Sequence, residues 1–240
     1  MRSGKTVAVV VPAYDEAARI GRVVRNVPAW VDRIIVVDDG SRDDTAGAAS
    51  SSGDLRVRVL RLPENRGVGA AIVAGYHDAR DLGVDIVAVM AGDDQMDPND
   101  LPELVAPLVS GDADYVKGNR FAHPERRRMP VLRRGAGKVL AAATRATTGL
   151  AINDSQCGYT AITMDAVRRL PLHDLWPRYG YPNDLLLLLA RENLRVVERP
   201  VRPIYAGERS GVRPWHALVI LGILARRTWS ARAGAAAVTR

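Results

Sequence analysis

Short apolar runs alternate with amphipathic segments along the first half of the chain. Residues 7–11 are consecutive aliphatic residues, and Pro12 ends this run. In the segment that follows, apolar residues recur at the spacing of one helix face, at Ile20, Val23, Val24 and Val27. This part of the chain therefore predicts a strand, a loop and a helix.

The same unit of strand, loop and helix is repeated further along. Apolar runs at residues 34–37, 57–62 and 85–90 predict three more strands. One helix is predicted to follow a capping box of Ser41 and Asp44, and another spans residues 67 to about 80. Continuous apolar strands that alternate with helices predict an α/β fold, with a mostly parallel central sheet and helices on both faces.

Beyond residue 112 the pattern is looser. A strand is predicted near residues 115–117, a helix over about 131–147, and a strand that enters a short helix over 155–164. The whole chain of 240 residues is long enough for one α/β domain with an appendage. We therefore expect a single domain.

Acidic residues come directly after three of the predicted strands, in the segments Tyr14-Asp15-Glu16, Asp38-Asp39-Gly40-Ser41 and Gly92-Asp93-Asp94-Gln95. In open α/β sheets ligands bind beyond the carboxyl ends of the strands, so these loops are expected to form one site. Asp38 or Asp39 could accept hydrogen bonds from a base or a ribose. Asp-Asp-Gly-Ser is also an ordinary turn sequence, and both interpretations stay open.

The loop after the fourth strand is rich in oxygen ligands, from Asp93, Asp94, Gln95 and Asp97. Such a group favours a hard cation such as Mg²⁺ or Mn²⁺, which keeps waters and phosphate oxygens as its other ligands. Asp97 precedes Pro98 in the pattern of a helix N-cap, so we assign it that role. Asp93 and Gln95 remain as the predicted metal-site residues.

Charge and cysteine content exclude some classes of protein. The net charge of +7 indicates attraction to polyanions such as nucleic acid, lipid headgroups or phosphorylated substrates. Carboxylates at the strand ends would repel a phosphate backbone, which argues against nucleic-acid binding. Cys157 is the only cysteine, so an internal disulfide is excluded, and no apolar stretch reaches the roughly 18 residues of a spanning helix. We expect a cytoplasmic protein.

Taken in order, four segments resemble the successive motifs of family 2 glycosyltransferases: residues 11–16, 37–41, 65–69 and 93–98. The likeness is greatest to the dolichyl- or polyprenyl-phosphate sugar synthases and covers about residues 6–213. It implies a glycosyltransferase A fold, inversion at the anomeric carbon and a divalent metal, Mg²⁺ or Mn²⁺. It also implies a nucleoside-diphosphate sugar donor of the GDP-mannose or UDP-glucose type and a polyprenyl-phosphate acceptor at a membrane surface.

The resemblance also implies roles for individual residues. Asp93 and Gln95 match the metal-site residues, and Arg120 matches an arginine near the diphosphate. Asp154 and Gln156 match a segment that lines the sugar and acceptor pocket. The nucleotide-binding set is Pro12, Tyr14, Glu16, Asp38, Asp39 and Asp94.

The acceptor is the point at which this sequence departs from the family pattern. A phosphate acceptor would be held by arginines, for which the candidates are Arg133, Arg134, Arg209 and Arg213. The alternative is transfer to a hydroxyl of a soluble sugar or natural product, with Asp184 or Asp154 as the catalytic base. Ala91 replaces the first acid of the usual Asp-X-Asp motif, and Asp94 is expected to compensate.

The resemblance divides the chain into a catalytic domain over residues 1–213 and a C-terminal amphipathic helix and tail over 214–240. Within the catalytic domain, the nucleotide-binding half is expected at about 1–112 and the acceptor half at about 113–213. Apolar residues between 215 and 224 are flanked by arginines and tryptophans, which suits a membrane interface at the inner face of the membrane. Docking of this helix on the core or on a second subunit is the alternative.

Overall fold

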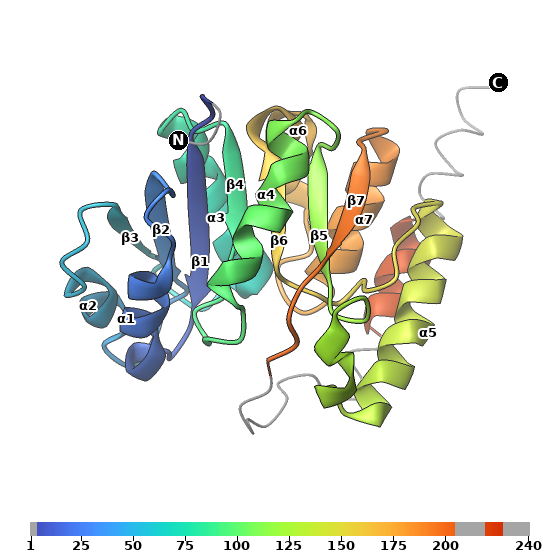
Figure 1. The fold of residues 1–240 in the computed structure, drawn as a ribbon, viewed down its shortest axis with the longest axis horizontal. Coiled ribbons are helices and arrows are strands. Elements are labelled where there is room, and N and C mark those ends of the chain that lie inside the picture. The colour runs from blue at the N-terminus through green and yellow to red at the C-terminus, as the bar shows by residue number, and fades with distance from the viewer. Residues whose placement is uncertain (1–3, 205–218, 228–240) are drawn as a thin grey trace.

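The computed structural model describes residues 4–204 and 219–227 and contains a seven-stranded sheet in the order β3-β2-β1-β4-β6-β5-β7 (Figure 1). The strands are β1 (Val7–Ala13), β2 (Arg33–Asp38), β3 (Val57–Arg61), β4 (Ile86–Val89), β5 (Tyr115–Asn119), β6 (Thr160–Thr163) and β7 (Val196–Pro200). Only β6 runs antiparallel to its neighbours, β4 and β5. The prediction of a mostly parallel sheet is therefore confirmed.

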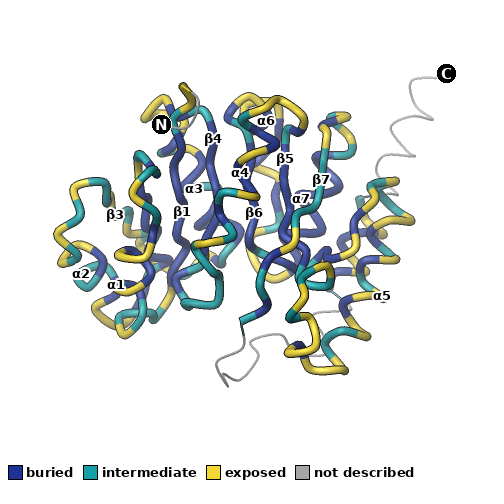
Figure 2. Tube along the Cα trace, viewed as in Figure 1, coloured by how far each residue is buried: buried dark blue, intermediate teal, exposed yellow. Residues whose placement is uncertain are grey.

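Helices cover both faces of the sheet, as the apolar strands require. The helices are α1 (Ala17–Asn26), α2 (Thr45–Ser50), α3 (Val68–Asp81), α4 (Leu101–Val109), α5 (Val131–Thr148), α6 (Met164–Arg169) and α7 (Tyr181–Arg191). Val7, Val9 and Val11 of β1 face α1, α2 and α4, whereas Ala8 and Val10 face α3, α6 and α7. The strands in the middle of the sheet are consequently buried on both sides (Figure 2).

The helix after β2 begins later than the sequence predicts. The backbone N–H of Ser41 donates to Asp38, and the Ser41 hydroxyl accepts a hydrogen bond from the N–H of Asp15. Ser41 therefore belongs to a turn that ties two loops together and does not cap a helix. Helix α2 begins at Thr45, with Asp44 in the N-cap position.

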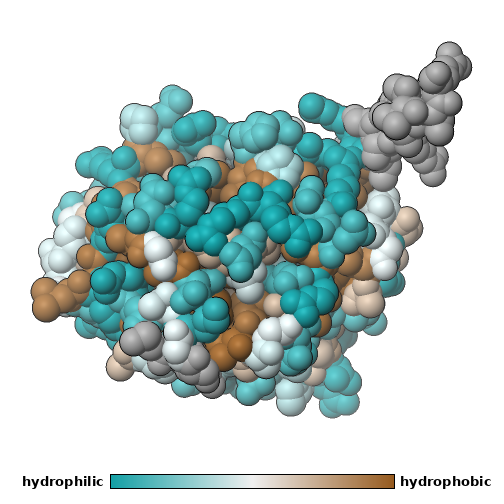
Figure 3. All heavy atoms as spheres, turned by 90° about the horizontal axis from the view of Figure 1, so that it is seen from above, coloured by the Kyte–Doolittle hydropathy of each residue, from teal (hydrophilic) through white to brown (hydrophobic). Residues whose placement is uncertain are grey.

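Three short 3₁₀ segments complete the described secondary structure: Pro98–Asp100, Pro124–Arg128 and Leu172–Asp174. The first has the predicted cap, because the Asp97 side chain accepts a hydrogen bond from the N–H of Asn99. At the amino ends of the parallel strands the surface is mostly hydrophilic, with smaller hydrophobic areas between (Figure 3). This mixture is usual for a solvated surface.

Residues 219–227 form a helix that docks on the protein, next to α5 and α7 (Figure 1). Ile220 and Leu224 pack against Leu187 of α7. Arg227 binds both carboxylate oxygens of Asp184 at 2.8 and 2.9 Å. The docked-helix interpretation therefore holds for this segment, while the rest of the predicted C-terminal helix and tail lies outside the described residues. Within the described ranges no helix has both the length and the apolar character needed to cross a bilayer.

We predict that Arg227→Ala lowers the stability of the protein. Asp184 is buried, and removal of its partner leaves a charged carboxylate in the core without a compensating positive charge, which costs about 3 kcal/mol. For a chain of this size the melting temperature should fall by roughly 6–12 °C. Calorimetry measures the shift, with the exposed neighbour Arg226→Ala as the matched control, and equal melting temperatures for the two variants would contradict the prediction.

Candidate functional site

Parallel pairing brings the three acidic loops to one edge of the sheet. Strand β1 lies between β2 and β4, and all three run in the same direction. Backbone bonds continue past the strands, from the N–H of Asp39 to Ala13 at 2.9 Å and from the N–H of Gly92 to Pro12 at 3.0 Å. The loops that follow β1, β2 and β4 therefore lie side by side, as the sequence predicts.

The loop after β1 is held by the loop after β2. Asp15 has a φ of 55°, and its carboxylate binds both the backbone N–H and the guanidinium of Arg42. These bonds hold the pKa of Asp15 below its usual value. The same guanidinium lies 5.7 Å from the centre of the Tyr14 ring, and this ring is partly exposed. Tyr14 thus offers an aromatic face at the edge where a base is predicted to bind.

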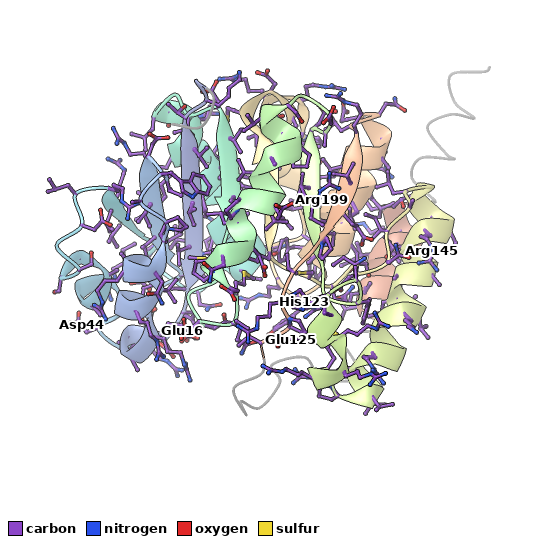
Figure 4. The ribbon with its side chains drawn as sticks, in the orientation of Figure 1. Glu16, Asp44, His123, Glu125, Arg145 and Arg199 are labelled. Atoms are coloured by element: carbon purple, nitrogen blue, oxygen red, sulfur yellow. The ribbon has the colours of Figure 1, made fainter. Side chains whose placement is uncertain are left out.

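Glu16 lies at the same edge (Figure 4). Its backbone N–H donates to the hydroxyl of Thr45, and its carboxylate pairs with Arg19 at 2.7 Å. The neighbouring N–H of Ala17 donates to Asp43. The start of α1 is therefore tied to the start of α2, which gives the predicted nucleoside end a rigid frame.

Asp38 and Asp39 are both buried, and their carboxylates accept hydrogen bonds from nearby backbone. One oxygen of Asp38 accepts the N–H of Ser41 at 2.9 Å. The two oxygens of Asp39 accept the N–H groups of Arg66 and Gly67 at 2.9 and 2.8 Å. Asp38 keeps one buried oxygen without a hydrogen-bond partner among the described residues, whereas each oxygen of Asp39 already accepts one bond.

The predicted metal site consists of Asp93 and Gln95, directly after β4. The N–H of Gln95 donates to one carboxylate oxygen of Asp93 at 3.1 Å. Asp94 has a φ of 62° and pairs with Arg22 of α1 at 2.8 Å. Asp94 was predicted to bind the nucleotide and to replace the acid that Ala91 lacks. The ion pair with Arg22 competes with both of these roles.

The oxygen ligands that the protein offers here suit a metal ion whose other ligands are substrate phosphates and waters. In the described ranges His, Cys, Asp and Glu side chains form no group of three or more that could hold a metal ion. Mg²⁺ is commonly bound by one or two carboxylates together with substrate phosphates and waters. A site with Asp93 as its carboxylate and Gln95 as a second oxygen donor matches that pattern.

Arg120 follows β5 and is fixed by Asp154. The Arg120 side chain binds the two carboxylate oxygens at 2.8 and 2.9 Å, and its backbone N–H donates to the same group. Burial alone would raise the pKa of Asp154, but the Arg120 charge and hydrogen bonds hold it below its usual value. Asp154 is fully buried and therefore acts as the support of Arg120, which does not suit a catalytic base.

A second buried network lies beside this ion pair. Lys117 is fully buried in β5 and donates to the carbonyl of Cys157 at 2.6 Å, and burial lowers the pKa of its ammonium group. Glu198 of β7 accepts the N–H groups of Asn153 and Asp154 at 2.8 Å. The sequence interpretation missed Lys117, although a lysine next to Tyr115 and Val116 in a predicted strand is an available signal.

Gln156 and the Asn183-Asp184 pair belong to a polar network between α5 and α7. The amide of Gln156 donates to Asn183 at 2.7 Å, and Asn183 donates to the Thr144 hydroxyl at 2.7 Å. Asp184 accepts the N–H of Trp176 in addition to its two bonds from Arg227. Because Asp184 is buried and its two oxygens are bound, it lacks the access that the predicted base requires.

The basic candidates occupy the same edge on the other half of the sheet. Arg133 and Arg134 are in the first turn of α5 and are partly buried. His123 and Glu125, in the preceding segment, lie at the lower edge, as Glu16 does on the first half (Figure 4). The other predicted acceptor ligands, Arg209 and Arg213, lie outside the described residues.

Tyr179 lies close enough to Asp93 to be affected by its charge, which the sequence interpretation did not anticipate. It precedes α7, and burial raises the pKa of its hydroxyl, as does the negative charge of Asp93. The phenol therefore stays neutral and keeps its proton beside the predicted metal ligand. Its distance of 86 residues from Asp93 in the chain leaves no local sequence signal for this approach.

Together, the loops place carboxylate and amide oxygens beneath β4 and an arginine held by a buried acid beneath β5. Such an edge can hold a polyphosphate between a cation site and a fixed guanidinium. The aromatic face of Tyr14 lies farther along, beneath β1.

Comparison with known proteins agrees with this geometry. Residues 8–170 match the model of "Glycosyl transferase family 2". A UDP-N-acetylglucosamine–dolichyl-phosphate N-acetylglucosaminyltransferase of Methanococcus voltae is 29% identical over 84% of this chain and 86% of the relative. An undecaprenyl-phosphate mannosyltransferase of Micrococcus luteus is 30% identical over 81% of this chain and 82% of the relative.

Solved structures show the same fold. Glucosyl-3-phosphoglycerate synthase of Mycobacterium tuberculosis superposes with a TM-score of 0.72 at 24% identity, covering 95% of this chain and 82% of the other. Its complex with Mn²⁺, UDP and glucosyl-3-phosphoglycerate gives 0.71 at 26% identity, covering 95% and 81%. The fold is therefore that of the glycosyltransferase A enzymes. With the family model spanning most of the chain, this protein belongs to family 2 of the glycosyltransferases.

Proposed function

We propose that this glycosyltransferase moves a hexose from a nucleoside-diphosphate sugar to a polyprenyl phosphate, with inversion at the anomeric carbon. The observation that carries the choice of acceptor is the state of the two candidate bases. Asp154 and Asp184 are both buried, and each is bound through two oxygens by an arginine. Neither carboxylate is placed to take a proton from an acceptor.

A phosphate acceptor removes the need for such a base. A hydroxyl must lose its proton during attack, and a positioned carboxylate normally receives it. A phosphate monoester has a second pKa of about 6, so near pH 7 most of it already carries the nucleophilic oxyanion. The structure and this chemistry therefore favour the phosphate over the hydroxyl.

The names of the relatives support the same choice. The relative from Methanococcus voltae is named for a dolichyl-phosphate acceptor, and that from Micrococcus luteus for an undecaprenyl-phosphate acceptor. Both are matched over more than four fifths of their length. Two acceptors of one chemical class, in relatives that span almost the same region, make that class the first candidate here.

On the donor side, the nucleoside is assigned to the loops after β1 and β2, with Tyr14 as its aromatic contact and Asp38 and Asp39 as acceptors. Asp93 and Gln95 would hold Mg²⁺ or Mn²⁺, which neutralises charge on the diphosphate when bound. The Mycobacterium tuberculosis neighbour, whose structure contains Mn²⁺ and UDP, supports this assignment.

Arg120 contributes a positive charge that does not move during the reaction. Its guanidinium is held by Asp154 before substrate binds, so little reorganisation is needed as charge develops on the leaving diphosphate. The acceptor oxyanion, held by Arg133 and Arg134, attacks the anomeric carbon from the opposite face. One carbon–oxygen bond forms, the bond to the diphosphate breaks, and the electron pair of that bond leaves with the nucleoside diphosphate.

A soluble acceptor is the second candidate, and one observation favours it. The neighbour with glucosyl-3-phosphoglycerate bound shares the fold over 95% of this chain, and its name specifies a small acceptor. Basic residues at the acceptor edge would bind a small phosphorylated molecule as well as a lipid phosphate. Competition between a short-chain polyprenyl phosphate and 3-phosphoglycerate for transfer separates the two candidates.

We predict that Asp93→Asn abolishes turnover and removes the metal dependence of nucleotide binding, because it takes away the carboxylate charge of an already thin metal site. Calorimetry with UDP and with GDP, each with and without Mn²⁺, measures the effect. The matched control is Asp94→Asn, whose carboxylate pairs with Arg22 and should leave the metal dependence in place. Unchanged metal dependence in Asp93→Asn would remove Asp93 from the site.

We predict different effects for substitution of Arg133, assigned to the acceptor, and of the buried Asp184. Arg133→Ala should raise the KM for polyprenyl phosphate by about 10-fold or more, since hydrogen bonds to charged groups contribute about 1.5–3 kcal/mol. Asp184→Asn should lower stability but retain kcat within about 10-fold when assayed well below its melting temperature. The exposed Arg33→Ala, at the amino end of β2, is the control for general loss of charge.

The result that contradicts this prediction is specific. A hydroxyl acceptor would make Asp184→Asn lose roughly 10²–10⁴-fold in kcat with donor binding intact, the usual contribution of a positioned base. If Arg133→Ala also left the acceptor KM unchanged, the polyprenyl-phosphate proposal would be wrong.

A further inference from the structure

Helix α5 presents an apolar stripe to solvent. Val131, Leu132 and Val139 are 74%, 85% and 68% exposed. They recur at helical spacing, and the small residues Ala136 and Ala142 continue the stripe along the same exposed side. Large aliphatic side chains exposed in a row on one helix face mark a surface that contacts another body.

The opposite side of α5 is the one that belongs to the fold. Gly137, Ala141 and Thr144 are buried, and Leu140 and Ala143 pack against the cluster formed by α7 and residues 219–227. The stripe is therefore additional to the hydrophobic contacts that hold α5 in place. Figure 2 shows exposed segments along this helix at the far end of the sheet from α2.

The stripe lies in the most basic part of the described chain. Residues 120–153 contain seven arginines and one lysine against a single acidic residue, Glu125. That carboxylate is itself paired with Arg128 and Arg202 at 2.9 and 3.2 Å. Arg126, Arg127 and Arg128 are exposed just before the stripe, and Lys138 is exposed beside it.

The position of the stripe relates it to the acceptor edge. Helix α5 starts at the edge where the carboxyl end of β5 lies and rises from there along the side of the molecule (Figure 1). Val131 and Leu132 are consequently next to the arginines assigned to the acceptor. A flat partner against this end of α5 would face the predicted acceptor site.

A second copy of the chain is a poorer partner for this surface. A two-fold contact would place the same cationic cluster opposite itself, and like charges across an interface are unfavourable. The exposed stripe is also aliphatic and small, whereas protein interfaces are enriched in aromatic anchors. Aliphatic side chains flanked by arginine and lysine suit the boundary between acyl chains and anionic headgroups.

We propose that the α5 outer face, defined as Val131, Leu132, Ala136 and Val139 with Arg126, Arg127, Arg128 and Lys138, docks on an anionic lipid bilayer. The aliphatic residues enter the headgroup boundary and the cations bind lipid phosphates. The use of this surface, delivery of a membrane-embedded acceptor to the adjacent edge, rests on the proposed function. The binding itself does not, so the two can be tested apart.

The experiment is flotation of the whole protein with large unilamellar vesicles, one set of neutral phosphatidylcholine and one containing phosphatidylglycerol. No sugar nucleotide or acceptor is added. Leu132→Ser should reduce partitioning into the anionic vesicles by about 10-fold, because burial of a leucine side chain is lost. Lys138→Glu should reduce it by roughly 5- to 30-fold, since each basic residue near an anionic surface contributes strongly.

The chain supplies a matched control in Leu55, which is fully exposed in the loop before β3, at the other end of the sheet. Leu55→Ser should leave partitioning unchanged, and melting temperatures verify that each variant is folded. Equal partitioning of Leu132→Ser and Leu55→Ser would overturn the proposal. So would light scattering that shows a dimer of the parent protein which Leu132→Ser dissociates, because the stripe would then be a subunit interface.

Failure of the proposed function would look different. If the protein binds anionic vesicles through this surface but transfers sugar only to a soluble acceptor, the docking proposal is supported and the proposed lipid acceptor is wrong. If transfer to a short-chain, water-soluble polyprenyl phosphate is normal in Leu132→Ser while transfer to the vesicle-embedded acceptor drops, both the docking proposal and the proposed acceptor are supported.

Discussion

The constraint on which the rest of this structure depends is the parallel pairing of β1 with both β2 and β4. Parallel strands end at the same edge, so one choice of strand order brings three acidic loops together without any contact specific to them. The loops are then joined to one another by their own side chains, as Asp15 binds Arg42 and Asp39 binds the backbone at Arg66. The site is thus built by the sheet and refined by local hydrogen bonds.

Both buried carboxylates on the acceptor side hold an arginine, and in each case the arginine gains a fixed position. Asp154 holds Arg120 just after β5, and Asp184 anchors the helix at residues 219–227. An acid whose two oxygens both bind an arginine offers no unoccupied oxygen to take a proton from an acceptor. The chemistry available at this edge is therefore electrostatic, which agrees with an acceptor that brings its own negative charge.

Much of the fold could be predicted from sequence because apolar strands carry their own signal, as at residues 7–11 and 34–37. The strand ends were predicted for the same reason, and the loops that carry Asp93 and Gln95 follow from them, whereas Arg120 was assigned from the resemblance to family 2 glycosyltransferases. The failures all depend on tertiary partners. Ser41 is in the sequence position of a helix cap but forms hydrogen bonds with Asp15 and Asp38. Asp94 forms an ion pair with Arg22, and the partner of Asp184 is Arg227, 43 residues away. No local pattern encodes such pairings.

The distance in sequence between Asp184 and Arg227 has a consequence for how the chain folds during synthesis. Asp184 leaves the ribosome 43 residues before the guanidinium that neutralises it. A buried carboxylate without a partner is strongly unfavourable, so the first turn of α7 can reach its native burial only after the later helix has docked. The buried Asp39 of the first half has nearer partners, at Arg66 and Gly67, 27 and 28 residues later, so it is α7 whose packing waits for this late arginine.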